Sequence, residues 1–377
     1  MKIAIITLHR AENYGSVLQA FALQKKIEEF GHDVCILDYH PERYTNRGKL
    51  KRLKNQKNKL DNPLLLFVAR ILIYPSYLRK NKVFENFIKN HLRISTFKFA
   101  TNEQAKEIDL HDFDAFCTGS DQVWNSHWNE GIEKALFLDF VPQNKLVFSY
   151  AASIGRSELP QDEIDITIKL LSKYEHLSVR EDTGVEILHK LGRTDAVQVL
   201  DPTLLMTKTE WDVYADDRYE NKQYILTYNL HHDQEIDRYA LALSSKYGIP
   251  IWNISYNWHD IVRKGHLCWC PSVEKFLGLI KHARFIIADS FHATAFSIIF
   301  ERQFVTITPE VASSRISSIL SLLGIGERNL SKFTDTSIIE SQIDYQLVKQ
   351  RLEKARQTSM RYLQKATASN TEFTHNR

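Results

Sequence analysis

The sequence has few of the features that mark a disulfide-stabilised or zinc-binding protein. Its 377 residues include four scattered cysteines, Cys35, Cys117, Cys268 and Cys270, which are too few for a disulfide framework. No secretory signal precedes them, so we expect a cytoplasmic protein. Cys268 and Cys270 are close together, but they have no second pair and no histidine pair at zinc spacing. We therefore expect a structural role for them and no metal site.

Phosphate-binding glycine loops and membrane-spanning runs are also missing. Neither G-x-x-x-x-G-K-[S/T] nor G-x-G-x-x-G occurs, so a nucleoside triphosphate or dinucleotide site of the usual kind is not indicated. The most apolar stretch, residues 64–78 (LLLFVARILIYPSYL), is interrupted by Arg70 and Pro75 and is too short to cross a bilayer. The formal net charge is only +3, which gives no reason to expect a nucleic-acid partner.

What remains is an alternation of strand-like and helix-like segments. Residues 2–8 predict a strand, residues 17–30 a helix that ends at Gly31, and residues 34–39 a second strand. Strand, helix and strand within forty residues are typical of a βαβ unit and a parallel sheet. The same alternation predicts strands at 113–117, 145–151, 176–180, 197–200, 224–230, 249–254, 284–288 and 304–307, with helices at 162–174, 183–191, 233–247, 273–282, from about 293, and 314–323.

Two successive series of this kind predict an α/β protein with two Rossmann-like, doubly wound domains that face each other across a cleft. We place the first domain at residues 1–206 and the second at 207–340, with a C-terminal helix and tail at 341–377 that could cross back onto the first domain. Ligands of such folds bind in the cleft, at the carboxyl ends of the strands.

An insertion at residues 45–100 does not fit the alternation. Seven basic residues with no acid between them lie from Arg47 to Lys59, and the apolar stretch 64–78 follows. One interpretation is an exposed basic helix followed by a buried helix. The other is a surface that contacts anionic lipid head groups, with the apolar stretch inserted shallowly.

Four short segments carry polar side chains where strands are expected to end: 10–16 (RAENYGS), 119–125 (GSDQVWN), 178–181 (SVRE) and 289–294 (DSFHAT). In the last of them, Ser290 and His292 lie at a helix N-terminus, where free N–H groups and the helix dipole favour an anion such as phosphate. A histidine there can also donate a proton near neutral pH. The simpler interpretation is a capping serine and a hydrogen-bonded turn residue.

Two arginines are candidate anion contacts. Arg180 ends an expected strand, where its planar guanidinium can pair with a neighbouring acid or grip a carboxylate or phosphate with two hydrogen bonds. Arg315 opens an expected helix of the second domain and is either a further anion contact or a solvated side chain.

Five stretches, taken together and in order, resemble the polysaccharide pyruvyl transferase family. They are NYGSVLQAFALQ (13–24), CTGSDQVWN (117–125), SVRE (178–181), VLDPTLL (199–205) and DSFHATAFSIIF (289–300). The resemblance extends from the first strand to about Leu323, and it departs in detail at Ser16 and Ala293, where alanine and glycine are commoner. It implies a GT-B-like fold and transfer of the pyruvyl group of phosphoenolpyruvate (PEP) onto a sugar of a cell-surface polysaccharide precursor, usually as a cyclic ketal.

The chemistry that the resemblance implies needs an acid for the PEP methylene carbon, cations for its carboxylate and phosphate, and a base for a sugar hydroxyl. We expect the catalytic residues to be His292, Asp121 and Arg180, and the donor-binding residues to be Arg180, Ser290, His292, Thr294 and Arg315. The expected acceptor-binding residues are Asn13, Tyr14, Ser120, Gln122 and Trp124. Trp124 or Trp128 would offer an apolar face to the sugar, unless the tryptophans fill the core and Asp121 caps the next helix.

The same resemblance implies the partners. PEP is the expected co-substrate, with no cofactor and no metal required, and the acceptor is a lipid-linked or nucleotide-linked glycan. An anionic membrane surface, at the inner face of the cell membrane, is a further candidate partner. Two alternatives remain open: a GT-B-type glycosyltransferase that uses a nucleotide sugar, since one fold hosts many functions, and a catalytically silent glycan-binding protein.

Overall fold

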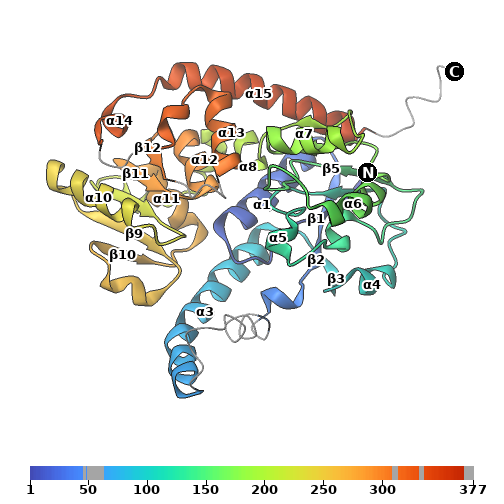
Figure 1. Cartoon of the computed structure of the whole chain (residues 1–377), viewed down its shortest axis with the longest axis horizontal. Helices are drawn as coiled ribbons and strands as arrows, with labels where there is room; N and C mark the ends of the chain where they lie inside the picture. Colours follow the sequence, from blue (N-terminus) through green and yellow to red (C-terminus); the bar gives the residue numbers. More distant parts are fainter. Residues whose placement is uncertain (46–47, 49–62, 308–312, 331–334, 369–377) are drawn as a thin grey trace.

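The structure, a computed structural model of the chain, describes residues 1–45, 48, 63–307, 313–330 and 335–368 (Figure 1). The side chains of residues 63–72 and 313 are not described either. The basic run between Arg47 and Lys59 therefore lies outside the described residues, and the prediction made for it stays a prediction.

The first sheet contains five parallel strands in the order β3-β2-β1-β4-β5. Its strands are β1 (Lys2–Ile6), β2 (Asp33–Tyr39), β3 (Ile94–Phe99), β4 (Ala115–Thr118) and β5 (Leu146–Ser149). Helix α1 (Tyr14–Glu28) connects β1 to β2, which confirms the predicted βαβ unit. Strand β3 was not expected, because this edge strand has one fully buried residue and its sequence carries little apolar signal.

The second sheet repeats this topology, with five parallel strands in the order β10-β9-β8-β11-β12. Its strands are β8 (Ile225–Tyr228), β9 (Ile251–Ser255), β10 (His266–Trp269), β11 (Phe285–Ala288) and β12 (Gln303–Thr306), and its main helices are α10 (Gln234–Tyr247), α11 (Val273–His282), α12 (Phe291–Ile299) and α13 (Ser313–Leu323). In both sheets the carboxyl ends of the strands share one edge, so the loops that follow them gather there.

Two short strands, seven shorter helices and several 3₁₀ turns accompany the two sheets in the described part of the chain. Strands β6 (Ser178–Val179) and β7 (Val197–Gln198) pair in parallel, and single bridges such as Ala152 to Val179 join them to the segment that follows β5. The other α-helices are α4 (Asn102–Lys106), α5 (Ser126–Asn129), α6 (Ile164–Leu171), α7 (Asp182–Lys190), α8 (Pro202–Leu205), α9 (Lys208–Asp212) and α14 (Ser337–Glu340). The 3₁₀ turns are Glu42–Tyr44, Lys134–Phe137, Gln161–Glu163, Asp217–Tyr219, Trp258–Val262 and Gly326–Arg328.

The C-terminal helix α15 (Tyr345–Ala366) spans both halves of the molecule (Figure 1). The Ser359 hydroxyl accepts a hydrogen bond from the Leu200 N–H at 3.0 Å, and the Tyr362 hydroxyl donates to the Ser149 carbonyl at 2.8 Å, at the end of β5. These contacts confirm that the helix crosses back onto the first domain. The predicted boundaries at residues 206 and 340 stay a prediction.

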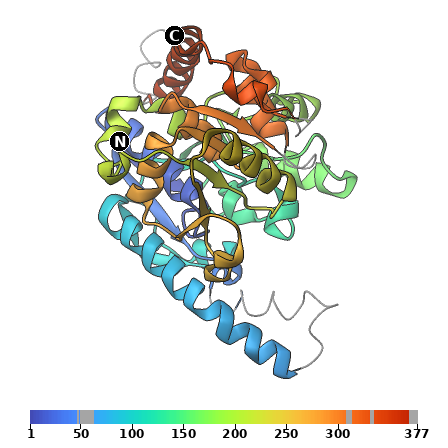
Figure 2. The same ribbon diagram turned by 90° about the vertical axis from the view of Figure 1, so that its left-hand side faces the viewer.

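Helix α3 (Pro63–His91) projects from one side of the molecule (Figure 2). Tyr74 and Leu78 are exposed, whereas the Ser76 hydroxyl is buried and accepts a hydrogen bond from the Trp258 N–H at 3.0 Å. The described part of the apolar stretch is therefore not a wholly buried helix. Among the described helices, none is long and apolar enough to cross a membrane.

Candidate active site

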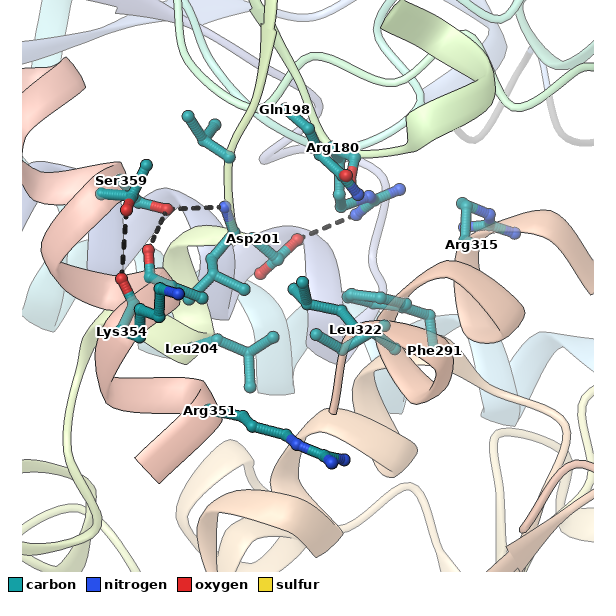
Figure 3. A pocket seen from close by; sticks show the side chains of 15 residues that line it. Arg180, Gln198, Asp201, Leu204, Phe291, Arg315, Leu322, Arg351, Lys354 and Ser359 are labelled. Carbon is teal, nitrogen blue, oxygen red and sulfur yellow. Dashed lines mark hydrogen bonds and ion pairs between the residues drawn. The ribbon is translucent and has the colours of Figure 1, made fainter. Parts of the chain in front are cut away.

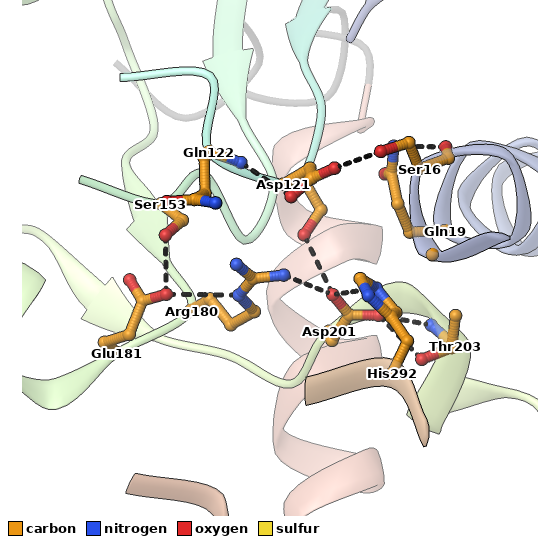
Figure 4. A network of polar contacts seen from close by, with 12 residues as sticks. Ser16, Gln19, Asp121, Gln122, Ser153, Arg180, Glu181, Asp201, Thr203 and His292 are labelled. Atoms are coloured by element: carbon orange, nitrogen blue, oxygen red, sulfur yellow. Dashed lines mark hydrogen bonds and ion pairs between the residues drawn. The ribbon is translucent and has the colours of Figure 1, made fainter. Parts of the chain in front are cut away.

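A buried polar network lies where the loops after β1, β4, β6 and β7 meet the N-terminus of α12 (Figure 4). Four of the segments predicted from the sequence contribute to it, through Ser16, Asp121, Arg180 and His292. The fifth contributor is Asp201, which lies at the N-terminus of α8.

Asp201 is the hub of this network and is 1% exposed. Its Oδ2 accepts hydrogen bonds from Arg180 Nη1 at 2.8 Å and Ser120 Oγ at 3.2 Å, and lies 3.6 Å from His292 Nε2. Its Oδ1 accepts from the N–H and the hydroxyl of Thr203, in the first turn of α8. Burial alone would raise the pKa of this carboxyl, but His292, Arg180 and Thr203 hold the pKa far below its usual range. Asp201 is therefore a fixed negative charge that joins the two predicted donor-binding residues.

Arg180 is 4% exposed and is held in place from three sides. Its Nε donates to Glu181 Oε1 at 3.1 Å, its Nη1 donates to Asp201, and its guanidinium lies 4.6 Å from the centre of the Phe291 ring. Burial opposes the charged form, but Glu181, Asp201 and Asp121 raise the pKa of Arg180 above its usual value. The arginine is therefore fully charged and pre-oriented.

Three buried atoms on Arg180, Glu181 and His292 have no hydrogen-bond partner among the described residues. They are Arg180 Nη2, Glu181 Oε2 and His292 Nε2. Buried polar groups are nearly always hydrogen-bonded, so open atoms gathered at one place are typical of a ligand site. A ligand bound there would meet one guanidinium N–H of Arg180, one carboxylate oxygen of Glu181 and one imidazole nitrogen of His292.

His292 occupies the first turn of α12 and is packed tightly against the start of α1. A Cβ placed on Gly15 would lie 1.9 Å from His292 Nδ1, so only glycine lets the two helix ends approach this closely. Ser290 holds the predicted N-cap position, but its side chain makes no capping hydrogen bond to a described N–H. The Thr294 hydroxyl donates to the Ser290 carbonyl at 3.0 Å and is 1% exposed, so the structure assigns it to the helix and not to a ligand.

A cavity of about 370 Å³ opens beside Arg180 and Asp201, between the two domains and α15 (Figure 3). Its charged lining consists of Arg180, Arg315 from α13, and Arg351 and Lys354 from α15, against the single carboxylate of Asp201. Burial and then the charge of Arg180 lower the pKa of Arg315. Four cations around one acid repel each other, so an anionic ligand would relieve this repulsion.

Two residues predicted to bind the acceptor are core residues. Tyr14 has no exposed surface: its ring stacks on Phe276 with centroids 4.1 Å apart, and its hydroxyl donates to the Pro271 carbonyl at 2.6 Å. Trp124 is 4% exposed and stacks on Phe137 at 5.2 Å. Both rings therefore pack in the core, and the acceptor role predicted for Tyr14 and Trp124 stays a prediction that nothing in these contacts supports. Trp128 is 54% exposed, and its proposed role is not tested.

The remaining predicted residues position the backbone around the site. Asn13 caps α1 by accepting from the Gly15 N–H at 2.8 Å, and Gln122 accepts from the Asn125 side chain at 2.7 Å. Ser120 is fully buried and donates to Asp201, so it orders the network, and its predicted contact with a sugar stays a prediction.

Asp121 has a left-handed backbone (φ 76°) and accepts from Ser16 Oγ at 2.6 Å. It does not cap α5, because Asn125 holds that position and accepts from the Trp128 N–H. In the described ranges, no group of three or more His, Cys, Asp or Glu side chains is placed to hold a metal ion.

The sequence alone did not single out Asp201 as a functional residue. The available signal was its place in VLDPTLL, where an acid directly follows an expected strand and precedes a proline that begins a helix. The predicted pairing of Arg180 with its neighbouring acid is confirmed by the contact with Glu181. Ser153 was missed: its Oγ donates to Glu181 Oε1 at 2.6 Å.

Comparison with known proteins agrees with this arrangement. The family described as polysaccharide pyruvyl transferase matches residues 13–310, which include every member of the network. No curated protein matches the chain. Among solved structures, a protein assigned as a UDP-N-acetylglucosamine 2-epimerase from Listeria monocytogenes aligns over 100% of this chain and 97% of its own, with 10% identity and a TM-score of 0.54.

Two further structures are similar at lower scores. The S. aureus protein MnaA, solved with UDP, aligns over 95% of this chain and 90% of its own, with 13% identity and a TM-score of 0.49. The E. coli heptosyltransferase WaaC, solved with ADP-2-deoxy-2-fluoro heptose, aligns over 94% and 99%, with 11% identity and a TM-score of 0.42. At these identities the likeness shows the fold alone. The epimerase match and the two parallel sheets confirm a GT-B-type fold of two Rossmann-like domains.

Proposed function

Because the chain belongs to the polysaccharide pyruvyl transferase family, we propose that it transfers the pyruvyl group of PEP onto a sugar of a cell-surface polysaccharide precursor and forms a pyruvate ketal. The observation that carries the proposal is the cationic cavity beside Arg180. PEP is a small trianion at neutral pH, and the cavity surrounds one acid with four cations.

The donor would bind between the two domains. Arg180 Nη2 is free to donate to the PEP carboxylate or phosphate, and Arg315 faces the same cavity from α13 (Figure 3). The two cations come from different parts of the chain, and Arg180 is held in place by Glu181 and Asp201 before the ligand arrives. Such preorganisation favours binding, because little ordering is left to complete.

The chemistry requires a proton at the methylene carbon of PEP and the loss of a proton from a sugar hydroxyl. His292 would supply the first proton, with its ring oriented by Asp201 and by the start of α1. Asp121 would accept the hydroxyl proton, since its carboxylate lies in the same network and is held by Ser16. The oxygen of this hydroxyl would bond to C2 of PEP as the methylene carbon is protonated. A second sugar hydroxyl would then bond to the same carbon while the C2–O bond to phosphate breaks, and its proton would leave with inorganic phosphate as the ketal closes.

The test is direct. The protein is incubated with PEP and a panel of glycan acceptors, and inorganic phosphate release is measured beside saturation-transfer NMR with PEP and with nucleotide sugars. We expect PEP to bind and phosphate to be released only with an acceptor. Binding of a nucleotide sugar without PEP would replace the proposal with a glycosyltransferase, and binding of glycan alone would indicate a non-catalytic glycan-binding protein.

A further inference from the structure

A histidine and an aspartate to which the proposed reaction gives no role lie side by side in the second domain. His231 is in the loop after β8, and Asp289 directly follows β11. The two strands are neighbours in the sheet, with Tyr228 opposite Ala288 at their carboxyl ends. In doubly wound folds the loops at this edge of the sheet hold the ligand.

Asp289 fixes the position of His231. The Asp289 side chain has no exposed surface. Its Oδ1 accepts a hydrogen bond from the Leu230 N–H at 2.9 Å, and its Oδ2 accepts from the N–H and from Nδ1 of His231, both at 2.8 Å. Because an ionised carboxylate only accepts, Nδ1 carries a proton. The ring is therefore held at Nδ1, and Nε2 is directed away from Asp289.

The rest of the imidazole ring is open to a ligand. The His231 side chain is 49% exposed, whereas the carboxylate that holds it is fully buried. A histidine whose Nδ1 is oriented by a buried carboxylate and whose Nε2 can meet a substrate is suited to proton transfer near neutral pH.

Two connections place this pair beside the cavity of Arg180. Two residues after Asp289 comes Phe291, which lines the cavity and packs against the Arg180 guanidinium. Arg315, another lining residue, interacts electrostatically with both Arg180 and His231. A phosphate group held between the two arginines would therefore have His231 on its second-domain side.

The charge of His231 suits an anionic ligand. Charged groups of three segments face the ring: Asp289 after β11, Asp233 at the start of α10 and Arg315 in α13. The hydrogen bond to Asp289 raises the pKa of His231 above its ordinary value, against the effects of burial and of the Arg315 charge. A bound phosphate would favour the imidazolium further, because it adds a negative charge.

The proposed reaction needs a proton at the phosphate group. Ketal formation breaks the C2–O bond of PEP, and the bonding electron pair stays on the phosphate oxygen. That oxygen must gain a proton, because inorganic phosphate at neutral pH is a mixture of its monohydrogen and dihydrogen ions. His292 and Asp121 are assigned to the methylene carbon and to the first sugar hydroxyl, so the leaving group has no acid of its own.

We propose that His231 binds the phosphate group of PEP through Nε2 and donates a proton to the oxygen that leaves C2. The neutral ring then accepts the proton of the second sugar hydroxyl, which restores the imidazolium, so the products are the ketal and inorganic phosphate. Asp289 is a positioning residue, because it contacts His231 and not the substrate. The inference rests on the proposed function and adds one catalytic residue to it.

The test separates the two ring nitrogens of His231. His231→Asn keeps a side-chain N–H near the position of Nδ1, which Asp289 can accept, and removes Nε2. His231→Gln places an amide N–H near the position of Nε2, so it can bind phosphate but cannot act as an acid. His232→Asn is the matched control, because His232 is exposed and its left-handed backbone (φ 55°) suits asparagine. PEP affinity is measured by calorimetry without acceptor, and phosphate release is measured with the acceptor panel as a function of pH.

We expect His231→Asn to weaken PEP binding by at least about tenfold, as for one hydrogen bond to a charged group, and to lower kcat by about 10²-fold. His231→Gln should recover most of the PEP affinity but not kcat. Above neutral pH, kcat/KM should fall less steeply in His231→Gln than in the unmodified protein, because one group fewer must be protonated.

Three results would contradict the inference. Binding and turnover of both His231 variants equal to those of His232→Asn would overturn it and leave the proposed function standing. An unchanged slope of the pH profile in His231→Gln would overturn proton donation by His231. An unmodified protein that does not bind PEP would overturn both the inference and the proposed function.

Discussion

The substitution Gly15→Ala tests whether the position of His292 matters for turnover. The added methyl carbon would lie 1.9 Å from His292 Nδ1 and 2.3 Å from Cε1, whereas ordinary van der Waals contact begins at 3.4 Å. The imidazole ring must therefore retreat by about 1.5 Å, or the start of α1 must shift by a similar amount. The start of α1 resists such a shift, because Asn13 caps this turn and the Tyr14 ring is stacked in the core.

We expect Gly15→Ala to lower both the stability of the protein and its rate of turnover. Overpacking of a buried site costs about 1–3 kcal/mol of unfolding free energy, so the protein should remain folded with a lowered melting temperature. A catalytic group displaced by about 1 Å can lose about 10²-fold in rate. We expect turnover of PEP and acceptor to fall by about that factor, while PEP binding to Arg180 and Arg315 changes little.

The assay is phosphate release at saturating PEP, with calorimetry for PEP affinity and thermal unfolding for stability. Gly326→Ala is the matched control, because a Cβ at Gly326 has open space around it. Full turnover in a folded Gly15→Ala protein would refute the reasoning, since it would show that His292 is not needed where the structure places it.

Four other predictions concern the donor site, the stability of the network, metals and the basic run. Arg180→Ala should weaken PEP binding by about 2–5 kcal/mol, with the exposed Arg361→Ala as control, and unchanged affinity would remove Arg180 from the donor site. Asp201→Asn should destabilise the protein at pH 7. Since the pKa of Asp201 is lower in the folded than in the unfolded state, its stabilisation is complete above about pH 4 and is lost as pH falls further; the gap between the two proteins in urea unfolding should narrow toward pH 2. Turnover should survive EDTA, and loss restored by magnesium or manganese would favour the glycosyltransferase alternative. The protein should float with anionic vesicles at low salt and detach at physiological salt; indifference at low salt would leave the basic run as a solvated surface.

The sequence by itself determined the elements of this fold. The spacing of apolar residues located most of the parallel strands and their connecting helices. Each of these elements buries one face, and the spacing of its apolar residues along the segment shows which face that is. The helix that begins at residue 291, the strand end at Arg180 and the crossing of the C-terminal helix could be read in this way. The edge strands β3 and β10 could not, because β3 has one buried residue and β10 has none, so neither needs a clear apolar pattern.

Only the tertiary structure decided what each polar or aromatic residue of these segments does. Tyr14 and Trp124 lie in motifs rich in polar groups, yet rings from distant segments cover both. Asp201 joins Arg180 to His292, which lie 112 positions apart in the sequence, and α15 brings Arg351 and Lys354 to the same cavity. The physical reason is that burial and charge pairing depend on neighbours distant in sequence, whereas periodicity reports only which face of a segment is buried.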